Sequence, residues 1–390
     1  MSQAPLAGLK VVELARILAG PWIGQTLAEL GADVIKIESP DGDDTRHWGP
    51  PYIDEGEGKR SAAYFHACNR GKRSMIADFN SSDDMRAVRA LIASADIVIE
   101  NFKVGGVKKF ALDYQSLQPT HPRLIYCSVT GFGQTGPYAH RPGYDFMIQG
   151  MSGIMDLTGE PDGSPQKVGV AFADIFTGLY GVIAIQAALR ARENSGCGQH
   201  IDMALFDCMA AVLANQSMNF LASGVTPKRM GNAHPNIAPY QTFPVADGYI
   251  IVACGNDGQF SRLCQVLAMP ELPVSEAFAT NAQRVQNRLV LEQTLAAKTA
   301  LWTRDSLLEA LEKATVPAGP INTVGDLFAD EQFHHRQMLV ELDGVPGLRT
   351  PIRFSGASFN PSRRSPRLGE HTAEILAEIG LGDHVEGRFP

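Results

Sequence analysis

The sequence predicts an α/β fold: a large domain built on a doubly wound, Rossmann-like parallel sheet, together with a smaller α/β domain. Three observations lead to this prediction. A chain of 390 residues is longer than one ordinary domain. Strand-like and helix-like runs alternate through about the first 200 residues, and such alternation is typical of parallel sheets. Apolar residues make up 44% of the chain and charged residues 19%, which is sufficient for packed cores.

The sheet begins with a βαβ unit. Residues 11–14 form a strand-like run, Gly20 and Pro21 open a helical pattern that Gly31 closes, and residues 32–38 read as a second strand. Proline is favoured in the first turn of a helix and glycine directly after its last turn. Because strand, helix and strand follow within about 30 residues, the two strands are expected to pair in parallel.

The pattern continues more loosely along the chain. A long, largely apolar helix is expected after Asp174, ending near Gly196, and its apolar first turns predict that it is buried. The other expected elements are a helix over 83–94, strands over 97–100 and 124–128, a helix over 202–223, a loop over 227–239, a strand over 248–253, helices within 289–314 and a short helix over 372–379.

Domain limits follow from this order. We expect a large domain over 1–200, completed by about 341–390 because the chain regains helical character after a segment rich in Pro, Ser and Arg. Residues 201–239 would form a linker helix and a loop, and residues 240–340 the small domain.

Composition narrows the function. A formal charge of −8 and a pI near 5.7 argue against nucleic acid as a partner. The six cysteines are scattered without a CxxC pair, so neither a disulfide framework nor a zinc ribbon is predicted, and no metal is expected. The first residues lack a signal-peptide pattern, and uninterrupted apolar runs stay well short of the roughly 20 residues of a membrane span. We therefore expect a soluble, cytoplasmic protein.

Common nucleotide and hydrolase motifs do not fit. The first βα turn, 19–24, cannot be aligned with GxGxxG, so NAD binding is not predicted. Residues 71–74 lack the glycine spacing of a phosphate loop, and residues 150–154 are not GxSxG. His334, His335 and His371 do not belong to an HExxH motif.

A series of polar motifs follows the expected strands, where open α/β sheets bind ligands. In chain order the motifs are Arg16 to Pro21, Lys36 to Glu38, Gly42 to Arg46, Asn69 to Ser74, Glu100 to Phe102, Gly131 to Pro137, Gly143 to Asp145, and Ala173 with Asp174. Together, and in this order, they resemble the family III CoA-transferases, which include formyl-CoA transferase, carnitine CoA-transferase and α-methylacyl-CoA racemase. The resemblance runs from about Leu6 to about Ile379.

The resemblance implies an interlocked, ring-like homodimer and an enzyme without a permanently bound cofactor, for which CoA and acyl-CoA are substrates. It also implies that Asp174, at the start of a long helix, is the nucleophile. The implied CoA-binding residues are Ile17, Leu18, Gly71, Lys72, Arg73, Ser74, Asn101, Phe102, Lys103, Lys109, Tyr144 and Asp145. One departure stands out: formyl-CoA transferase has an arginine directly after the second strand, and this chain has Ser39.

The implied acceptor site includes Arg16 and a flap over 231–240, with Gly231, Asn232 and His234 as substrate-binding residues. This flap resembles that of the dicarboxylate-acting members, such as the succinate–hydroxymethylglutarate and acetyl-CoA–oxalate transferases. Arg16 would clamp the second carboxylate of the acceptor by bidentate pairing. Alternatively, it pairs with a structural acid, Glu13 or Glu38.

Other readings stay open from the residues alone. Asp174 is also suited to be a helix N-cap, and the two roles are compatible because a helix N-terminus favours the ionised carboxylate. A racemase of the same superfamily is an alternative, although that branch has a histidine where this chain has Tyr144, a poor base near neutral pH. A non-catalytic acyl-CoA-binding protein is a third, disfavoured by Asp174. We expect CoA transfer from succinyl-CoA to a dicarboxylate through aspartyl anhydride and aspartyl-CoA intermediates.

Overall fold

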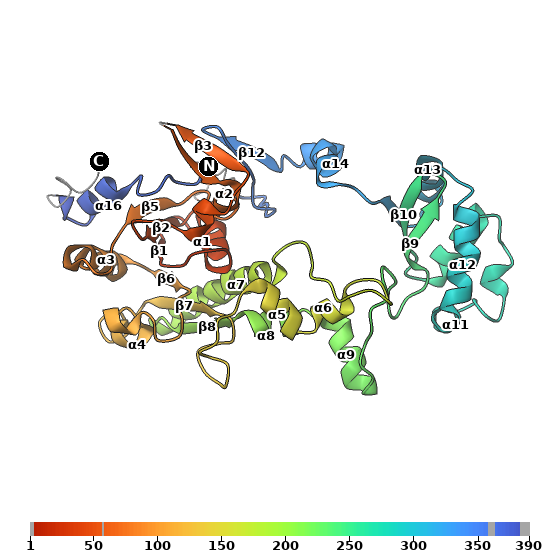
Figure 1. The fold of residues 1–390 in the computed structure, drawn as a ribbon, viewed down its shortest axis with the longest axis horizontal. Coiled ribbons are helices and arrows are strands. Elements are labelled where there is room, and N and C mark those ends of the chain that lie inside the picture. The colour runs from red at the N-terminus through yellow and green to blue at the C-terminus, as the bar shows by residue number, and fades with distance from the viewer. Residues whose placement is uncertain (1–3, 57, 358–362, 383–390) are drawn as a thin grey trace. The chain divides into compact units, whose positions relative to one another are not determined.

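The computed structural model describes residues 4–56, 58–357 and 363–382 and divides into two compact units (Figure 1). The first unit comprises residues 1–154, 168–218 and 336–390. The second comprises residues 155–167 and 219–335.

The first unit is built on a six-stranded sheet in the order β5-β2-β1-β6-β7-β8, and every neighbouring pair is parallel. From β1 the chain moves outward to β2 and β5, and then returns to the other side of β1 with β6. The strand order therefore reverses between β1 and β6, as it does in doubly wound folds. The strands are β1 (Lys10–Glu13), β2 (Asp33–Glu38), β5 (Arg73–Ile76), β6 (Ile97–Glu100), β7 (Ile125–Thr130) and β8 (His200–Ala204).

Both faces of this sheet are covered, because successive strand residues point to opposite sides. Val11 belongs to one apolar core and Val12 to the other. The first core includes residues of α1 (Ala19–Glu29), α7 (Phe172–Ser195) and α8 (Leu205–Ala211), and the second includes residues of α3 (Ser82–Ser94) and α16 (Thr372–Glu378). The predicted α/β class with a large parallel sheet is confirmed.

Helix α7 lies close against α1 because it has glycines three residues apart on the contact face. A Cβ on Gly178 would lie 2.9 Å from the Trp22 side chain, and one on Gly181 would lie 2.4 Å from Ile23 Cδ1. Among the described residues, α7 is the one helix whose length and composition would also suit a membrane span. Here it packs on α1, α5 (Asp145–Met151), α8, β7 and β8, with Ile185 fully buried, so it is a core helix.

The C-terminal segment returns to the first unit, where α16 packs beside the edge strand β5. Arg73 of β5 joins them, since its guanidinium bonds Glu374 at 3.0 Å and Glu378 at 2.7 Å, as well as Asp33 at 2.6 Å. The remaining elements of this unit are β3 (Tyr52–Gly56), β4 (Lys59–Ala62), α2 (Ala63–His66), α4 (Tyr114–Leu117), β12 (Leu339–Leu342) and β13 (Val345–Leu348).

The second unit contains an antiparallel sheet in the order β11-β10-β9, with a helical layer and its own apolar core. The core includes Phe243, Phe260 and Leu291, all nearly inaccessible to solvent. Its elements are β9 (Tyr240–Val245), β10 (Gly248–Ala253), β11 (Ala318–Pro320), α10 (Asp257–Val266), α11 (Asn281–Gln286), α12 (Arg288–Thr299), α13 (Arg304–Lys313), α14 (Val324–Ala329) and α15 (Glu331–His335). Helices α6 (Ile154–Leu157) and α9 (Ala214–Ser223) each contain one of the boundaries between the units.

One predicted element is wrong. The helix expected over 202–223 is in fact the edge strand β8, followed by two helices, α8 and α9. Backbone pairing of residues 200–204 with β7 determines the strand, and no local sequence pattern reveals that partner. The two helices are separate because Ala214 adopts a left-handed conformation, with φ of 46°. Residues 201–218, expected in the linker, lie in the first unit, and 155–167 lie in the second.

Candidate active site

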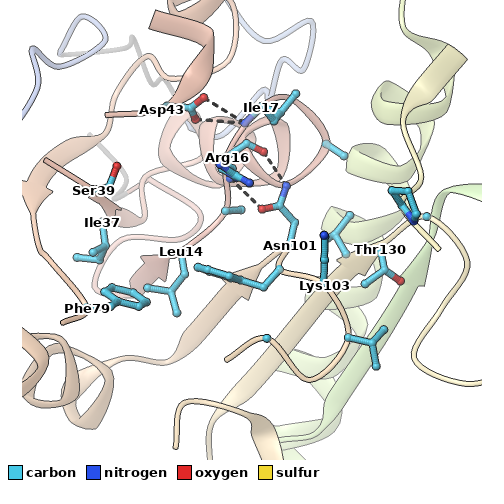
Figure 2. Close-up of a pocket in the computed structure, with 18 of the residues that line it drawn as sticks. Leu14, Arg16, Ile17, Ile37, Ser39, Asp43, Phe79, Asn101, Lys103 and Thr130 are labelled. Carbon is cyan, nitrogen blue, oxygen red and sulfur yellow. Dashed lines mark hydrogen bonds between the residues drawn. The ribbon is translucent and has the colours of Figure 1, made fainter. Parts of the chain in front are cut away.

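A cavity of about 790 Å³ opens at the carboxyl ends of β1, β2, β5, β6 and β7. It lies where the strand order reverses between β1 and β6, which is where open α/β sheets bind ligands. The segments that line it are residues 14–17, 36–40, 77–80, 101–106, 129–131 and 139–144, together with Asp174 of α7. Figure 2 shows part of this lining.

The turn from β1 into α1 is held in a strained conformation at one wall of the cavity. Ile17 has φ of 74°, which is rare for a β-branched residue. Asn101 makes two hydrogen bonds to the backbone of Arg16, the residue before Ile17. Its Oδ1 accepts the Arg16 N–H at 3.0 Å, and its Nδ2 donates to the Arg16 carbonyl at 2.6 Å. The Asp43 carboxylate accepts the Ile17 N–H at 3.2 Å (Figure 2). Asn101, directly after β6, and Asp43, in the loop after β2, thus fix the entry into α1.

A network of buried ion pairs holds Asp43 in this wall. Lys36 Nζ lies 2.9 Å from Asp43 and 3.1 Å from Glu13, and Lys72 Nζ lies 2.8 Å from Glu13, with all four side chains fully or almost fully inaccessible. Burial alone would raise the pKa of Asp43, but Lys36 and the Thr45 N–H hold that pKa at about 2. Asp43 therefore stays ionised and continues to accept the Ile17 N–H.

Asp174 lies in the first turn of α7 and faces the cavity. Its carboxylate also accepts the backbone N–H of Ala19, the first residue of α1. Two helix N-termini therefore meet at this carboxylate, and the partial positive charge of each favours its ionised form. Asp174 is not the N-cap of α7, because Ala171 occupies that position.

The protonation of Asp174 is nevertheless unusual. Burial, together with the negative charge of Asp145, raises the pKa of Asp174 to about 7, while the Ala19 N–H acts in the opposite direction. A carboxylate with a raised pKa is a stronger nucleophile than an ordinary one, and such values are typical of functional groups in clefts. The arrangement is suited to covalent catalysis by a carboxylate.

Cations and aromatic rings line the remaining walls. Lys103, Lys109 and Arg141 bring positive charge to the cavity, and Arg141 lies 4.0 Å from the Tyr138 ring. Phe79 and Phe102 stack with ring centroids 6.1 Å apart, and both line the cavity. Flat apolar surfaces beside cations suit a ligand that carries both an aromatic ring and phosphates.

Comparison with known proteins agrees with this chemistry. The model of CoA-transferase family III matches residues 6–372, nearly the whole chain. The chain belongs to CoA-transferase family III. It is 55% identical to the succinate–glutarate CoA-transferase of Agrobacterium fabrum, over 96% of each chain. It is 38% identical to the succinyl-CoA:mesaconate CoA-transferase of Haloarcula hispanica, over 97% of each chain.

A solved structure is also similar. A CaiB/BaiF family protein from Brucella suis is 68% identical to this family III chain, with a TM-score of 0.88 over 97% of this chain and all of that one. The family resemblance inferred from the motifs is therefore confirmed, including its dicarboxylate-acting branch.

Several residues implied by the resemblance to family III do lie together at the cavity. The lining includes Arg16, Ile17, Asn101, Phe102, Lys103, Lys109, Tyr144 and Asp174. Leu18 is buried at the N-cap of α1. Ser39, the departure from formyl-CoA transferase, also lines the cavity and donates to the Gly42 carbonyl.

The segment 71–74, for which CoA binding was predicted, is not part of the lining of this cavity. Lys72 is fully buried and bonds Glu13, Asn69 and the Pro21 carbonyl, and Arg73 is committed to carboxylates at the opposite end of the strand. Ser74 donates to Glu38 at 2.6 Å. The segment enters β5, whereas the cavity lies at the carboxyl ends of the strands, and the CoA-binding role of residues 71–74 remains a prediction.

The residues that leave β5 line the cavity instead: Ala77, Asp78, Phe79 and Asn80. The sequence analysis missed them, together with His140 and Arg141. The signal was available for the first group, because residues directly after a parallel strand are the expected ligand-binding positions.

Arg16 has a different partner from those considered. Its guanidinium bonds Asp44 at 2.9 Å, whereas Glu13 pairs with lysines and Glu38 takes two bonds from Arg46. The Arg16 side chain is 66% exposed at the cavity rim, so this ion pair is accessible to water and weak.

The flap residues lie in the second unit. The Gly231 N–H donates to the Gly159 carbonyl at 3.0 Å, Asn232 lies 3.4 Å from the Thr242 hydroxyl, and the His234 ring is 5.2 Å from that of Tyr240. Burial and the charge of Arg288 lower the pKa of His234. Their substrate-binding role remains a prediction.

Proposed function

We propose that this family III enzyme transfers CoA from succinyl-CoA to a free dicarboxylate, in the cytoplasm and without a bound cofactor. The observation that carries the proposal is Asp174, a partly buried carboxylate at two helix N-termini and at the wall of a cavity lined with cations. The activities of relatives that match nearly the full chain, succinate–glutarate and succinyl-CoA:mesaconate transfer, support this donor and acceptor class.

With Asp174 as a carboxylate nucleophile, the transfer proceeds through covalent intermediates. Asp174 attacks the thioester carbonyl of succinyl-CoA, the C–S bond breaks, and a mixed anhydride forms as the CoA thiolate leaves. The thiolate then attacks the Asp174 carbonyl, which releases succinate and leaves aspartyl-CoA. The acceptor carboxylate repeats these steps in reverse, so that the acceptor gains CoA and Asp174 returns as the carboxylate. No net proton is consumed.

Each step passes through a tetrahedral oxyanion, which requires hydrogen-bond donors already in place. The backbone N–H of Ala19 is suited to the oxyanion that forms on the Asp174 carbonyl when the thiolate attacks it, since this N–H already bonds the Asp174 carboxylate and belongs to the positive end of α1. The strained turn at Ile17, held by Asn101 and Asp43, fixes where that N–H points.

Arg16 is the candidate clamp for the second carboxylate of the acceptor. Its present partner, Asp44, is 48% exposed. Replacing this exposed carboxylate by that of a substrate therefore costs little free energy, because exposed ion pairs are weak. A bound dicarboxylate would therefore compete with Asp44 for the guanidinium.

We further propose that the enzyme is an interlocked homodimer. Apolar side chains on the packed helices α5 and α7 are exposed, among them Phe146 at 60% and Ile183 at 61%. Exposed apolar side chains gathered on packed helices are typical of protein interfaces.

The test of function is transfer from succinyl-CoA to glutarate, with Asp174→Ala as the matched variant. Wild type should form glutaryl-CoA, and the folded variant should form none. A variant with wild-type rates would exclude Asp174 as nucleophile. A wild type that fails to transfer CoA, but exchanges the α-hydrogen of a 2-methylacyl-CoA in D₂O, would instead establish the racemase alternative.

A further inference from the structure

The helix that carries the nucleophile is capped from another helix. The N-cap of α7 is Ala171, whose methyl group cannot accept a hydrogen bond. Asp145, the first residue of α5, supplies the missing acceptor, since its Oδ1 takes the Ala173 N–H at 2.8 Å. Ala173 directly precedes Asp174. The carboxylate of Asp145 is thus tied to the backbone that positions the nucleophile.

A buried glutamine holds Asp145 in this place. Gln149 Nε2 donates to Asp145 Oδ2 at 2.8 Å, and Gln149 Oε1 accepts the Val168 N–H at 2.9 Å. The Gln149 side chain is inaccessible to solvent. Gln149 therefore connects α5 to the segment that leads into α7, and both oxygens of Asp145 have a donor.

Asp145 is accordingly turned towards α7, although the family resemblance implied a contact with CoA. Tyr144, its neighbour, lines the cavity. Tyr64 of α2 is another titratable side chain that the charge of Asp174 affects. Burial, and then the negative charge of Asp174, raise the pKa of Tyr64, so the phenol stays neutral. From α1 Asp174 receives a backbone N–H, that of Ala19.

We propose that Asp145 is a positioning residue for the reaction: it caps α7 one residue before the nucleophile and places a second negative charge beside it. The inference rests on the proposed function, in which Asp174 attacks the thioester. The cap orients Asp174, and the neighbouring charge strengthens its affinity for a proton and hence its nucleophilicity. The like charge opposes the two helix N-termini, which on their own would leave Asp174 a weaker nucleophile.

The first variant is Asp145→Asn, which removes the charge and keeps an acceptor for the Ala173 N–H. The acid limb of kcat/KM for succinyl-CoA should move to lower pH by on the order of one pH unit, the size of a like-charge effect at short range. The maximal rate should fall, because the nucleophile becomes less basic. A purely structural residue would change the melting temperature without moving the pH midpoint.

The second variant restores the hydrogen bond between residues 145 and 149. In Asp145→Asn the new amide faces the Gln149 amide, two donors without an acceptor between them. Adding Gln149→Glu lets residue 149 accept from the new amide and keep the Val168 N–H, while the net charge returns to that of wild type. The double variant should recover thermal stability and part of the pH shift.

Asp113→Asn is the matched control, because Asp113 is also at a helix start in the first unit, at the N-cap of α4, and should leave the midpoint unchanged. An unchanged midpoint in folded Asp145→Asn would overturn the inference. If wild type shows no CoA transfer, the proposed function fails instead. The pH dependence of the melting temperature then still reports whether Asp145 shifts the ionisation of Asp174.

Discussion

Replacing the nucleophile by its neutral isostere should make the protein more stable at alkaline pH. The carboxylate of Asp174 is partly buried beside Asp145, so above its pKa the folded state holds a charge that the unfolded chain would place in water. Asp174→Asn removes that charge and its repulsion from Asp145, and retains an oxygen for the Ala19 N–H. The ionised carboxylate that the reaction requires therefore lowers the stability of the folded protein.

The magnitude follows from the pKa. The pKa of Asp174 rises from 3.8 to about 7, which is about 3 pH units, and each unit corresponds to about 1.4 kcal/mol. Ionised Asp174 therefore destabilises the fold by at most about 4 kcal/mol. Because the folded-state pKa lies above the unfolded one, stability is highest below pH 3.8 and is lost as the pH rises through 7.

The assay is thermal unfolding of wild type and Asp174→Asn at pH 5 and pH 8.5, with Asp113→Asn as the control. The stability advantage of Asp174→Asn should grow by roughly 2–3 kcal/mol between these pH values, because wild type loses most of this contribution in that range. The melting temperatures should separate by several degrees at pH 8.5. An advantage that stays constant with pH, or a less stable variant at pH 8.5, would refute the reasoning.

Further predictions concern the substrates and the assembly. Arg16→Leu should remove a preference of about ten- to a hundredfold for a dicarboxylate over a monocarboxylate of equal length, and Arg16→Lys should keep part of it; equal kcat/KM ratios in wild type and Arg16→Leu would make Arg16 structural. Lys109→Ala should raise KM for succinyl-CoA about tenfold and weaken its salt dependence. Lys72→Met should instead lower stability by roughly 3–5 kcal/mol, since it leaves Glu13 buried with fewer partners, and a change confined to KM would restore its predicted role at phosphate. In analytical ultracentrifugation the protein should remain a dimer at nanomolar concentration, and a monomer there would contradict the interlocked assembly.

The sequence predicted the sheet well wherever local signals and long-range pairing agree. The βαβ unit over 11–38 has glycine and proline at its helix ends, and the structure has strand, helix and strand there. Strand β8 was missed because residues 202–204 were expected to begin a helix, whereas their strand conformation depends on pairing with β7, some 70 residues away in the chain. Such partners are determined by tertiary packing, which overrides weak local preference.

Prediction of the candidate site likewise depended on whether the contacts of a residue are local in the sequence. Asp174 and Asn101 were predicted because their motifs, near the start of a helix and directly after a strand, resemble those of family III. Lys72 was predicted to bind phosphate, whereas the structure buries it with Glu13, a contact that no local sequence pattern reveals. The orientation of the Asp145 carboxylate towards α7 could not be predicted from its motif either, since this carboxylate accepts the N–H of Ala173, 28 residues later.

The return of the C-terminus to β5 affects how the protein folds while it is being made. Arg73 and its partner Glu378 are 305 residues apart in the sequence, and the entire second unit is synthesised between them. At about 5–20 residues per second, the ribosome takes roughly 15 to 60 seconds to complete that interval. During this time the edge strand lacks the helix that covers it, and exposed strand edges promote aggregation. The nascent chain is thus expected to need a chaperone until α16 has emerged.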